Sequence, residues 1–321
     1  MTNFQMSNDS DPPNRTFNFD FFPSSVCITL LTVLGIEANA IVTLNALAII
    51  VFLKEQRFHK SSIYLTISLA VADMFNVSNL IFSIFSLGNY CNIWTINYLS
   101  NPIEITGALF VYFPSVSLTN LTAISLERVH ATFRPFMHRL IKKKMLGAAV
   151  VAVWLIAAVF TVIISLRIQF DVIWFNVEPE AGAYLTFLFC CPFVILVSYT
   201  SIAIKFYCGT RPQHHGAISR ERKLTKTLFI VTVVSLTLLL PAMIVNLLVY
   251  VSPRLWESFE TKSHKTRWLA LYSVNFVYCA NSFINPLLYA YKMPEFKRAL
   301  LLLLRCRLRS EPVHVLPLNN L

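Results

Sequence analysis

Long apolar runs separated by short polar segments dominate this sequence. Each run is near or above the 20 or so residues that a helix needs to cross the hydrocarbon core of a bilayer. The runs cover residues 26–53, 62–86, 98–127, 145–167, 183–207, 224–251 and 268–291. They lack strict alternation of apolar and polar residues, which argues against a membrane β-barrel. The pattern predicts an all-α membrane protein, a seven-transmembrane helix bundle, whose outer surface faces lipid.

Composition and charge agree with this prediction. Of the 321 residues, 56% are hydrophobic and only 13% are charged, against roughly 25% charged in a soluble domain. A formal net charge of +11 would suit a nucleic-acid partner. However, most of the Lys and Arg residues follow the first, third, fifth and seventh spans, as the positive-inside rule requires. We therefore expect the bilayer, and no nucleic acid, as a partner, with an extracellular N-terminus and a cytoplasmic C-terminus at the plasma membrane.

The segments outside the spans divide the chain further. Residues 1–25 form a polar extracellular tail without the apolar core of a cleavable signal peptide, residues 26–291 form the transmembrane domain, and residues 292–321 are cytoplasmic. Asn8 and Asn14 begin glycosylation triplets on the outer side. After Pro294, charged and apolar residues recur at helical spacing, which predicts a short amphipathic eighth helix on the membrane surface. Cys306 follows it, as a palmitoylation site or a free thiol.

Polar side chains interrupt the apolar spans. Asp73 lies in the middle of the second span, where a carboxylate costs about 2.5–3.5 kcal/mol on insertion scales. Glu37 lies deep in the first span, and the sequence suggests no firm partner for it. An ionisable group at bilayer depth is a functional-site hypothesis by default. These residues therefore direct attention to the interior of the bundle.

Five motifs occur in a fixed order along the spans. They are Asn45 in the first, Leu69 to Asp73 in the second, Glu127-Arg128 at the end of the third, Trp154 in the fourth, and Asn285-Pro286-x-x-Tyr289 in the seventh. In this order they resemble the rhodopsin-like (class A) G-protein-coupled receptors, and the resemblance covers residues 26 to 306. It implies a receptor rather than an enzyme. The implied partners are a heterotrimeric G protein inside the cell and a small-molecule or peptide ligand outside.

The resemblance also implies roles for individual residues. The activation switch would comprise Glu127, Arg128, Glu221, Tyr199, Asn285, Pro286 and Tyr289. Arg128, Pro135 and Phe136 would contact the G protein. An allosteric sodium ion, the one cofactor considered, would be held by Asp73, Ser117, Asn281, Asn285 and Asn45. The alternative for this last set is a hydrogen-bonded network that only ties the helices together.

The expected ligand pocket lies between the outer halves of the spans. Its candidate residues are Phe110, Phe113, Asn246, Tyr272, Asn275 and Tyr278, although aromatic residues at helical spacing equally serve packing. Amine receptors of the family carry Asp where this chain has Phe110, and opsins carry Lys where it has Cys279. We therefore expect neither a monoamine nor retinal, but a neutral or amphipathic small molecule or a short peptide.

The chain departs from the family in several places. The usual Cys at the top of the third span is Ile103, so the common disulfide to the second outer loop is absent. Whether Cys27 pairs with Cys91 stays open. In the sixth span Leu239 replaces an aromatic switch residue, and Ser235 replaces a Phe. These changes leave two alternatives to a signalling receptor: a decoy or scaffold of the same fold, or a transporter, although no repeat indicates the latter.

Overall fold

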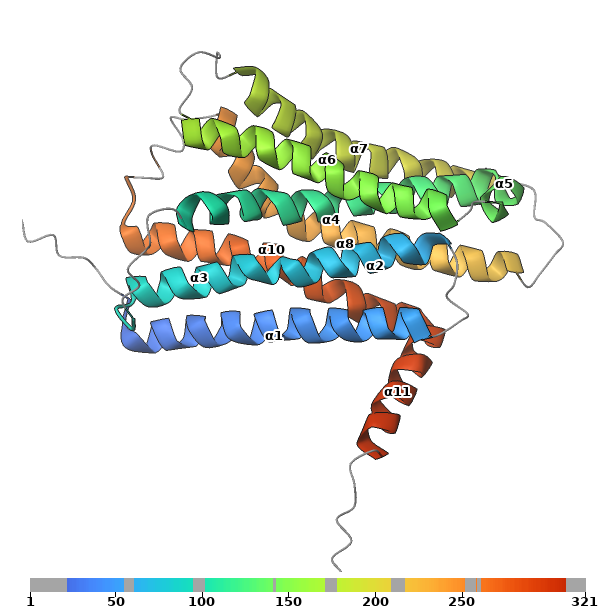
Figure 1. The fold of residues 1–321 in the computed structure, drawn as a ribbon, viewed down its shortest axis with the longest axis horizontal. Coiled ribbons are helices and arrows are strands. Elements are labelled where there is room, and N and C mark those ends of the chain that lie inside the picture. Colours follow the sequence, from blue (N-terminus) through green and yellow to red (C-terminus); the bar gives the residue numbers. More distant parts are fainter. Residues whose placement is uncertain are drawn as a thin grey trace, which may run out of the picture.

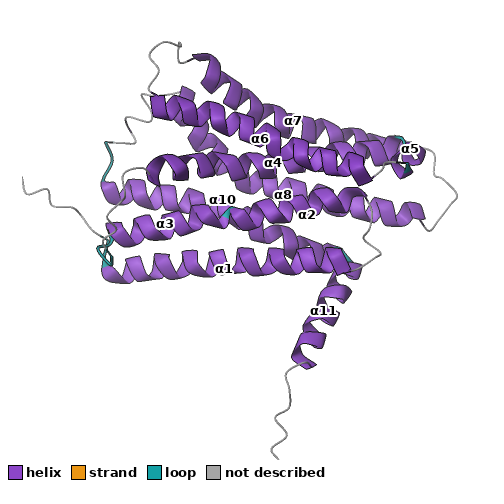
Figure 2. Ribbon diagram, viewed as in Figure 1, coloured by secondary structure: helices purple, strands orange, loops and turns teal. Residues whose placement is uncertain are grey.

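The long helices of this chain lie side by side in a single bundle (Figures 1 and 2). The computed structural model describes residues 22–54, 61–94, 102–140, 143–170, 178–208, 217–251, 258 and 261–309. Its helices are α1 (Ser24–Lys54), α2 (Ser61–Phe75), α3 (Val77–Tyr90), α4 (Pro102–Phe133), α5 (Pro135–Arg139), α6 (Lys143–Phe170), α7 (Glu178–Cys208), α8 (Ala217–Val251), α10 (His264–Lys292) and α11 (Pro294–Arg309). The helices α1, α2 with α3, α4, α6, α7, α8 and α10 follow the seven predicted spans in order. The predicted fold class is confirmed.

The bundle buries polar residues within an apolar core and exposes apolar side chains on its outer surface. Asp73 and Asn45 are fully buried, whereas Phe193 and Leu196 on α7 are each 65% exposed. Within the described residues, five segments are long and apolar enough to cross a membrane: Ser24–Lys54, Ile63–Tyr90, Lys144–Val162, Thr186–Lys205 and Thr225–Val245. Among the described residues, α4 contributes more buried polar side chains than any other helix, and α10 adds Asn281, Ser282 and Asn285. Apolar side chains that face outward suit lipid as the surrounding solvent.

Two proline residues create the corners at one end of the bundle. Arg134 has φ −129° and ψ 62°, and α5 begins at Pro135. Met293 is extended, with φ −112° and ψ 97°, and α11 begins at Pro294. A residue before proline avoids the helical conformation, and proline suits the first helical position. As a result, α11 leaves the bundle steeply at the end where α1 finishes (Figure 1), where the sequence predicts the eighth helix.

A disulfide closes the opposite end. Cys27 near the start of α1 bonds to Cys91 after α3, with their Cα atoms 6.2 Å apart. The chain after Cys91 folds back, so that the Trp94 indole N–H donates to the Phe85 carbonyl at 3.1 Å. The Trp94 ring occupies the space where a side chain on Gly88 would lie. The pairing that the sequence left open is therefore present, and it joins α1 to the end of α3.

At the end of the bundle that the positive-inside rule predicts to be cytoplasmic, the inner end, α4 and α7 are joined by one lysine. The Lys205 ammonium donates to the Thr132 carbonyl at 2.6 Å and lies 4.5 Å from the centre of the Phe133 ring. A cation at a helix C-terminus is favourable because the last carbonyls there lack helical partners. Further along the bundle, the Trp154 indole N–H donates to Ser68 Oγ at 3.0 Å and joins α6 to α2. These contacts tie α4 and α7 to each other and α6 to α2.

Candidate functional site

A buried polar cluster surrounds Asp73 in the middle of the bundle. Ser117 Oγ on α4 and Ser282 Oγ on α10 each donate to Asp73 Oδ1 at 3.2 Å. Asn285 Nδ2 donates to Asp73 Oδ2 at 2.9 Å. The carboxyl group is completely buried, and Ser282 and Asn285 share a face of α10 because they are three residues apart. Three of the five residues predicted for the sodium site are thus together.

The other two predicted residues lie beside the cluster without contacting the carboxyl group through a described hydrogen bond. Asn45 Nδ2 donates to the carbonyls of Ile41 and Ser282 at 3.0 and 2.8 Å. In the described part of the chain, the buried Oδ1 atoms of Asn45 and Asn281 have no hydrogen-bond partner. Amide and carboxylate oxygens are suitable ligands for a hard cation. The cluster therefore has an oxygen-rich composition and acceptors that a small cation could satisfy.

The cluster extends to α8 through the serine that replaces the family's phenylalanine. Ser235 is fully buried, and its Oγ donates to Asn285 Oδ1 at 3.1 Å. Toward the inner end, the hydroxyl groups of Tyr199 on α7 and Thr232 on α8 are 3.3 Å apart. In this conformation α8 is therefore held to α10 and to α7 by polar contacts. Ser235 was noted from sequence only as a departure, and its contact with Asn285 was not predicted.

At the inner end of α4, the predicted switch arginine is bound to its neighbouring acid. Arg128 is 1% exposed. Its Nε donates to Glu127 Oε2 at 2.6 Å and its Nη2 donates to Glu127 Oε1 at 2.5 Å. His138 Nε2 on α5 lies 2.6 Å from the same Oε1 atom. The side chain of Glu221, the second predicted acid, lies outside the described residues. His138 was not predicted from the sequence, because no fixed spacing relates it to Glu127.

The other residues predicted to act at the inner end differ in their exposure. Phe136 at the start of α5 is 80% exposed, and Pro135 beside it is also exposed. Tyr289 is buried, with its ring centre 5.6 Å from that of Phe52 and 6.0 Å from that of Phe296. An apolar side chain that projects from the inner end is available to a partner. Tyr289, by contrast, is packed between α1 and α11 in this conformation.

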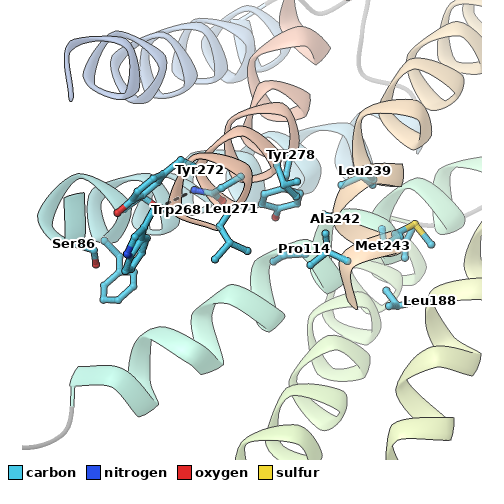
Figure 3. Close-up of a pocket in the computed structure, with 16 residues that line it drawn as sticks. Ser86, Pro114, Leu188, Leu239, Ala242, Met243, Trp268, Leu271, Tyr272 and Tyr278 are labelled. Atoms are coloured by element: carbon cyan, nitrogen blue, oxygen red, sulfur yellow. Dashed lines mark hydrogen bonds between the residues drawn. The ribbon is translucent and has the colours of Figure 1, made fainter. Parts of the chain in front are cut away.

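A cavity of about 430 Å³ opens between the outer halves of the helices (Figure 3). Its walls are mainly apolar, and its polar lining residues are Ser83, Ser86, Tyr272, Asn275 and Tyr278. Three of the predicted pocket residues, Tyr272, Asn275 and Tyr278, therefore line it. Leu239, which replaces the aromatic switch residue, also lines it and is 5% exposed.

The remaining predicted pocket residues do not line this cavity in the described structure. Phe113 is buried and stacks on Phe75, with ring centres 5.7 Å apart. The side chains of Phe110 and Asn246 lie outside the described residues, as do those of Cys306, Asn8 and Asn14. Pro114 and Trp268 also line the cavity, and Trp268 was not predicted there. Trp268 was missed because it lies at the edge of the last apolar span.

Comparisons with known proteins agree with this geometry. The family model described as "7 transmembrane receptor (rhodopsin family)" matches residues 44–289. Human lysophosphatidic acid receptor 3 is 25% identical over 282 residues, covering 84% of this chain and 76% of the receptor. The mouse lysophosphatidic acid receptor 3 is 24% identical over 296 residues, covering 86% and 78%. Squid rhodopsin superposes with a TM-score of 0.69 at 17% identity, covering 90% of this chain and 88% of that one.

Proposed function

Since this chain belongs to the rhodopsin family of seven-transmembrane receptors, we propose that it is a ligand-activated receptor that promotes nucleotide exchange on heterotrimeric G proteins. The receptor itself breaks no covalent bond in this proposal, because catalysis takes place in the partner. The ligand enters from the outer end, and the G protein binds at the inner end near α5.

The observation that carries this proposal is the state of Arg128. Its guanidinium is buried and makes two charge-assisted hydrogen bonds to Glu127, and His138 contacts the Oε1 atom of the same carboxylate. Removing one partner of a buried ion pair costs about 3–5 kcal/mol. A ligand that favours the open state by a comparable amount would therefore shift the population substantially. Arg128 is the group that opening would free, and Phe136 is the exposed apolar contact beside it.

The cavity supports an amphipathic ligand with an apolar part. None of its lining residues is charged, and most are aliphatic or aromatic. Lys265 and Arg267 lie at the start of α10, next to the lining residue Trp268. We propose that an apolar chain fills the cavity and that an anionic headgroup lies near the start of α10. The lysophosphatidic acid receptors among the relatives make a lysophospholipid the first compound to test.

We also propose that the Asp73 cluster binds sodium in the resting state. The support is the carboxyl group with the Ser117 and Ser282 hydroxyls on it, together with the buried Oδ1 atoms of Asn45 and Asn281, which lack a donor in the described structure. A bound cation would supply a positive charge to the buried carboxylate. Asp73→Asn removes the negative charge of the carboxylate. We therefore expect this variant to lose any stabilisation by NaCl relative to N-methyl-D-glucamine chloride.

The test of the proposed activity is a nucleotide-exchange assay on the purified receptor in nanodiscs. We expect the unmodified chain to accelerate GTPγS uptake by at least one member of a panel of heterotrimeric G proteins. Glu127→Gln should raise the basal rate, because it removes the charge that holds Arg128. Phe136→Ala should lower the rate without changing the thermal stability of the receptor. If neither the unmodified chain nor Glu127→Gln accelerates exchange on any G protein, the decoy alternative is favoured instead.

A further inference from the structure

If ligand binding in the cavity is to affect the Asp73 cluster, the two must be linked by residues other than an aromatic side chain on α8. At the position of the aromatic switch this chain has Leu239, which lines the cavity but has no polar side-chain atom. Its apolar side chain cannot hydrogen-bond to the cluster below. A signal from the cavity therefore requires another set of residues.

Two cavity residues on α10 point to that set. Tyr278 lines the cavity, and its hydroxyl group donates to Asn76 Oδ1 at 2.9 Å. Asn275, one turn toward the outer end, donates from Nδ2 to Ser83 Oγ at 2.8 Å. Both contacts cross from α10 to the second span. The cavity wall is thus hydrogen-bonded to α3 and to the residue that precedes it.

Asn76 is the centre of this network. It is 2% exposed, and it is the residue between the end of α2 and the start of α3. Its Oδ1 accepts from Tyr278 and from Asn79 Nδ2, the latter at 2.7 Å. Its Nδ2 donates to Ser282 Oγ at 3.1 Å, and Ser282 donates in turn to Asp73. A continuous path of three hydrogen bonds therefore leads from the tyrosine of the cavity wall to the buried carboxyl group.

We propose that Tyr278 and Asn76 are positioning residues that couple the cavity to the Asp73 cluster, in place of the absent aromatic residue on α8. An occupant that displaces the Tyr278 ring removes a donor from Asn76, and the Asn76 amide then reorients relative to Ser282 and Asp73. The coupling is reciprocal, so cation binding at Asp73 changes the affinity of the cavity by the same factor. This inference rests on the proposed sodium site. A coupling of about 5- to 150-fold is the usual range for linked sites.

The test places a tethered probe in the cavity, so that no natural ligand is needed. Leu271→Cys adds a thiol on the cavity lining, at a position that is 37% exposed. Benzyl methanethiosulfonate then attaches a benzyl group through a disulfide, and the same reagent on the chain without the new thiol reports reaction at its own cysteines. The readout is the midpoint of NaCl stabilisation in a thermal unfolding assay, with N-methyl-D-glucamine chloride holding ionic strength constant. We expect the tether to shift the midpoint by at least fivefold.

Variants on the path separate coupling from general damage. In the Leu271→Cys background, Tyr278→Phe removes one hydroxyl and Asn76→Leu removes the central amide, and each should reduce the shift to less than twofold. Tyr278→Phe keeps the ring and so remains informative if Asn76→Leu does not fold. The matched control is Thr161→Val, because Thr161 is equally a buried hydroxyl but bonds only to the Ala157 carbonyl in the described network. This control should retain the full shift.

The outcomes distinguish this inference from the sodium site on which it rests. If NaCl stabilises the receptor but the tether leaves the midpoint unchanged, the coupling is refuted and the sodium site stands. If the tether on Leu271→Cys shifts the midpoint equally with and without Tyr278→Phe or Asn76→Leu, the two sites are coupled but these residues do not provide the coupling. If NaCl has no specific effect in any background, the sodium site and the coupling fail together.

Discussion

The disulfide between Cys27 and Cys91 offers a quantitative test of how the outer end is held. The bond links residues that are 64 positions apart. Beside it, the Tyr90 ring lies 5.4 Å from Phe22 and 5.6 Å from Trp268, a residue of the cavity lining. Cleaving the bond should therefore loosen both the start of α1 and one side of the cavity.

The size of the effect follows from the length of the closed loop. In the chain-entropy account, closing a loop of this length restricts the unfolded chain by about 4 kcal/mol at 25 °C. This is an upper bound for a membrane protein, because much of the helical structure and its insertion persist when tertiary contacts are lost. We therefore expect a loss of about 1–4 kcal/mol. At about 2 °C per kcal/mol for a chain of this size, the Tm should fall by roughly 2–8 °C.

The assay compares the oxidised receptor with the receptor reduced by a phosphine and with the Cys27→Ser, Cys91→Ser double variant. Reduction and the double variant should lower the Tm equally, and mass spectrometry of the reduced receptor after treatment with iodoacetamide should show Cys27 and Cys91 both alkylated. Cys190→Ser is the control, because the Cys190 thiol is exposed and not in a disulfide, so its Tm should not change. An unchanged Tm in a receptor whose two thiols are fully alkylated would refute the reasoning.

Three further predictions concern buried and packed side chains. Glu37 is buried, and neither carboxyl oxygen has a hydrogen-bond partner among the described residues. The uncharged carboxyl is therefore favoured, so Glu37→Gln should change the Tm by less than about 2 °C. A larger fall in Tm would indicate that the Glu37 carboxyl is ionised. His138→Phe removes the contact with Glu127, a hydrogen bond worth about 0.5–1.5 kcal/mol. Basal GTPγS uptake should therefore rise about two- to tenfold. An unchanged rate would show that His138 does not stabilise the closed state. Gly88→Ala places a methyl group in the space of the Trp94 ring. In thermal unfolding it should destabilise the receptor by about 1–3 kcal/mol. An unchanged stability would show that the Trp94 ring moves aside without cost.

The fold was predictable because hydropathy alone defines a membrane bundle. An apolar run long enough to cross the bilayer has few alternatives to a helix, so the seven spans and their order were correct. Local irregularities were less accessible. The second span was predicted as one uniform helix, but the chain tightens at Asn76, where the Asn79 N–H donates to the Asn76 carbonyl three residues back at 3.0 Å. The third span extends past Glu127 to Phe133, because a helix can continue beyond the apolar run into a segment of mixed polar and apolar residues.

The site was predictable where helices carry a strong polar signal. Asp73 stood out as a carboxylate in hydrocarbon, and Ser117 and Asn285 do lie against it. Asn76 was not recognised as part of the site, although it lies three residues after Asp73 and three before Asn79, a spacing that places all three on one face. Contacts made through corners, such as that of His138 with Glu127, depend on tertiary geometry. No periodicity in the sequence encodes them.

The lysine bridge between α4 and α7 has a mechanical consequence for activation. Lys205 joins the ends of α4 and α7 at the inner face through a charged group, whereas the polar contacts of α8 with α7 and α10 are between neutral groups, Tyr199 with Thr232 and Ser235 with Asn285. We therefore expect α4 and α7 to stay fixed relative to each other during activation, and α8 to move. Any displacement that uncovers Arg128 should appear as a change in distance between α8 and this fixed frame, while the separation of α4 from α7 stays constant.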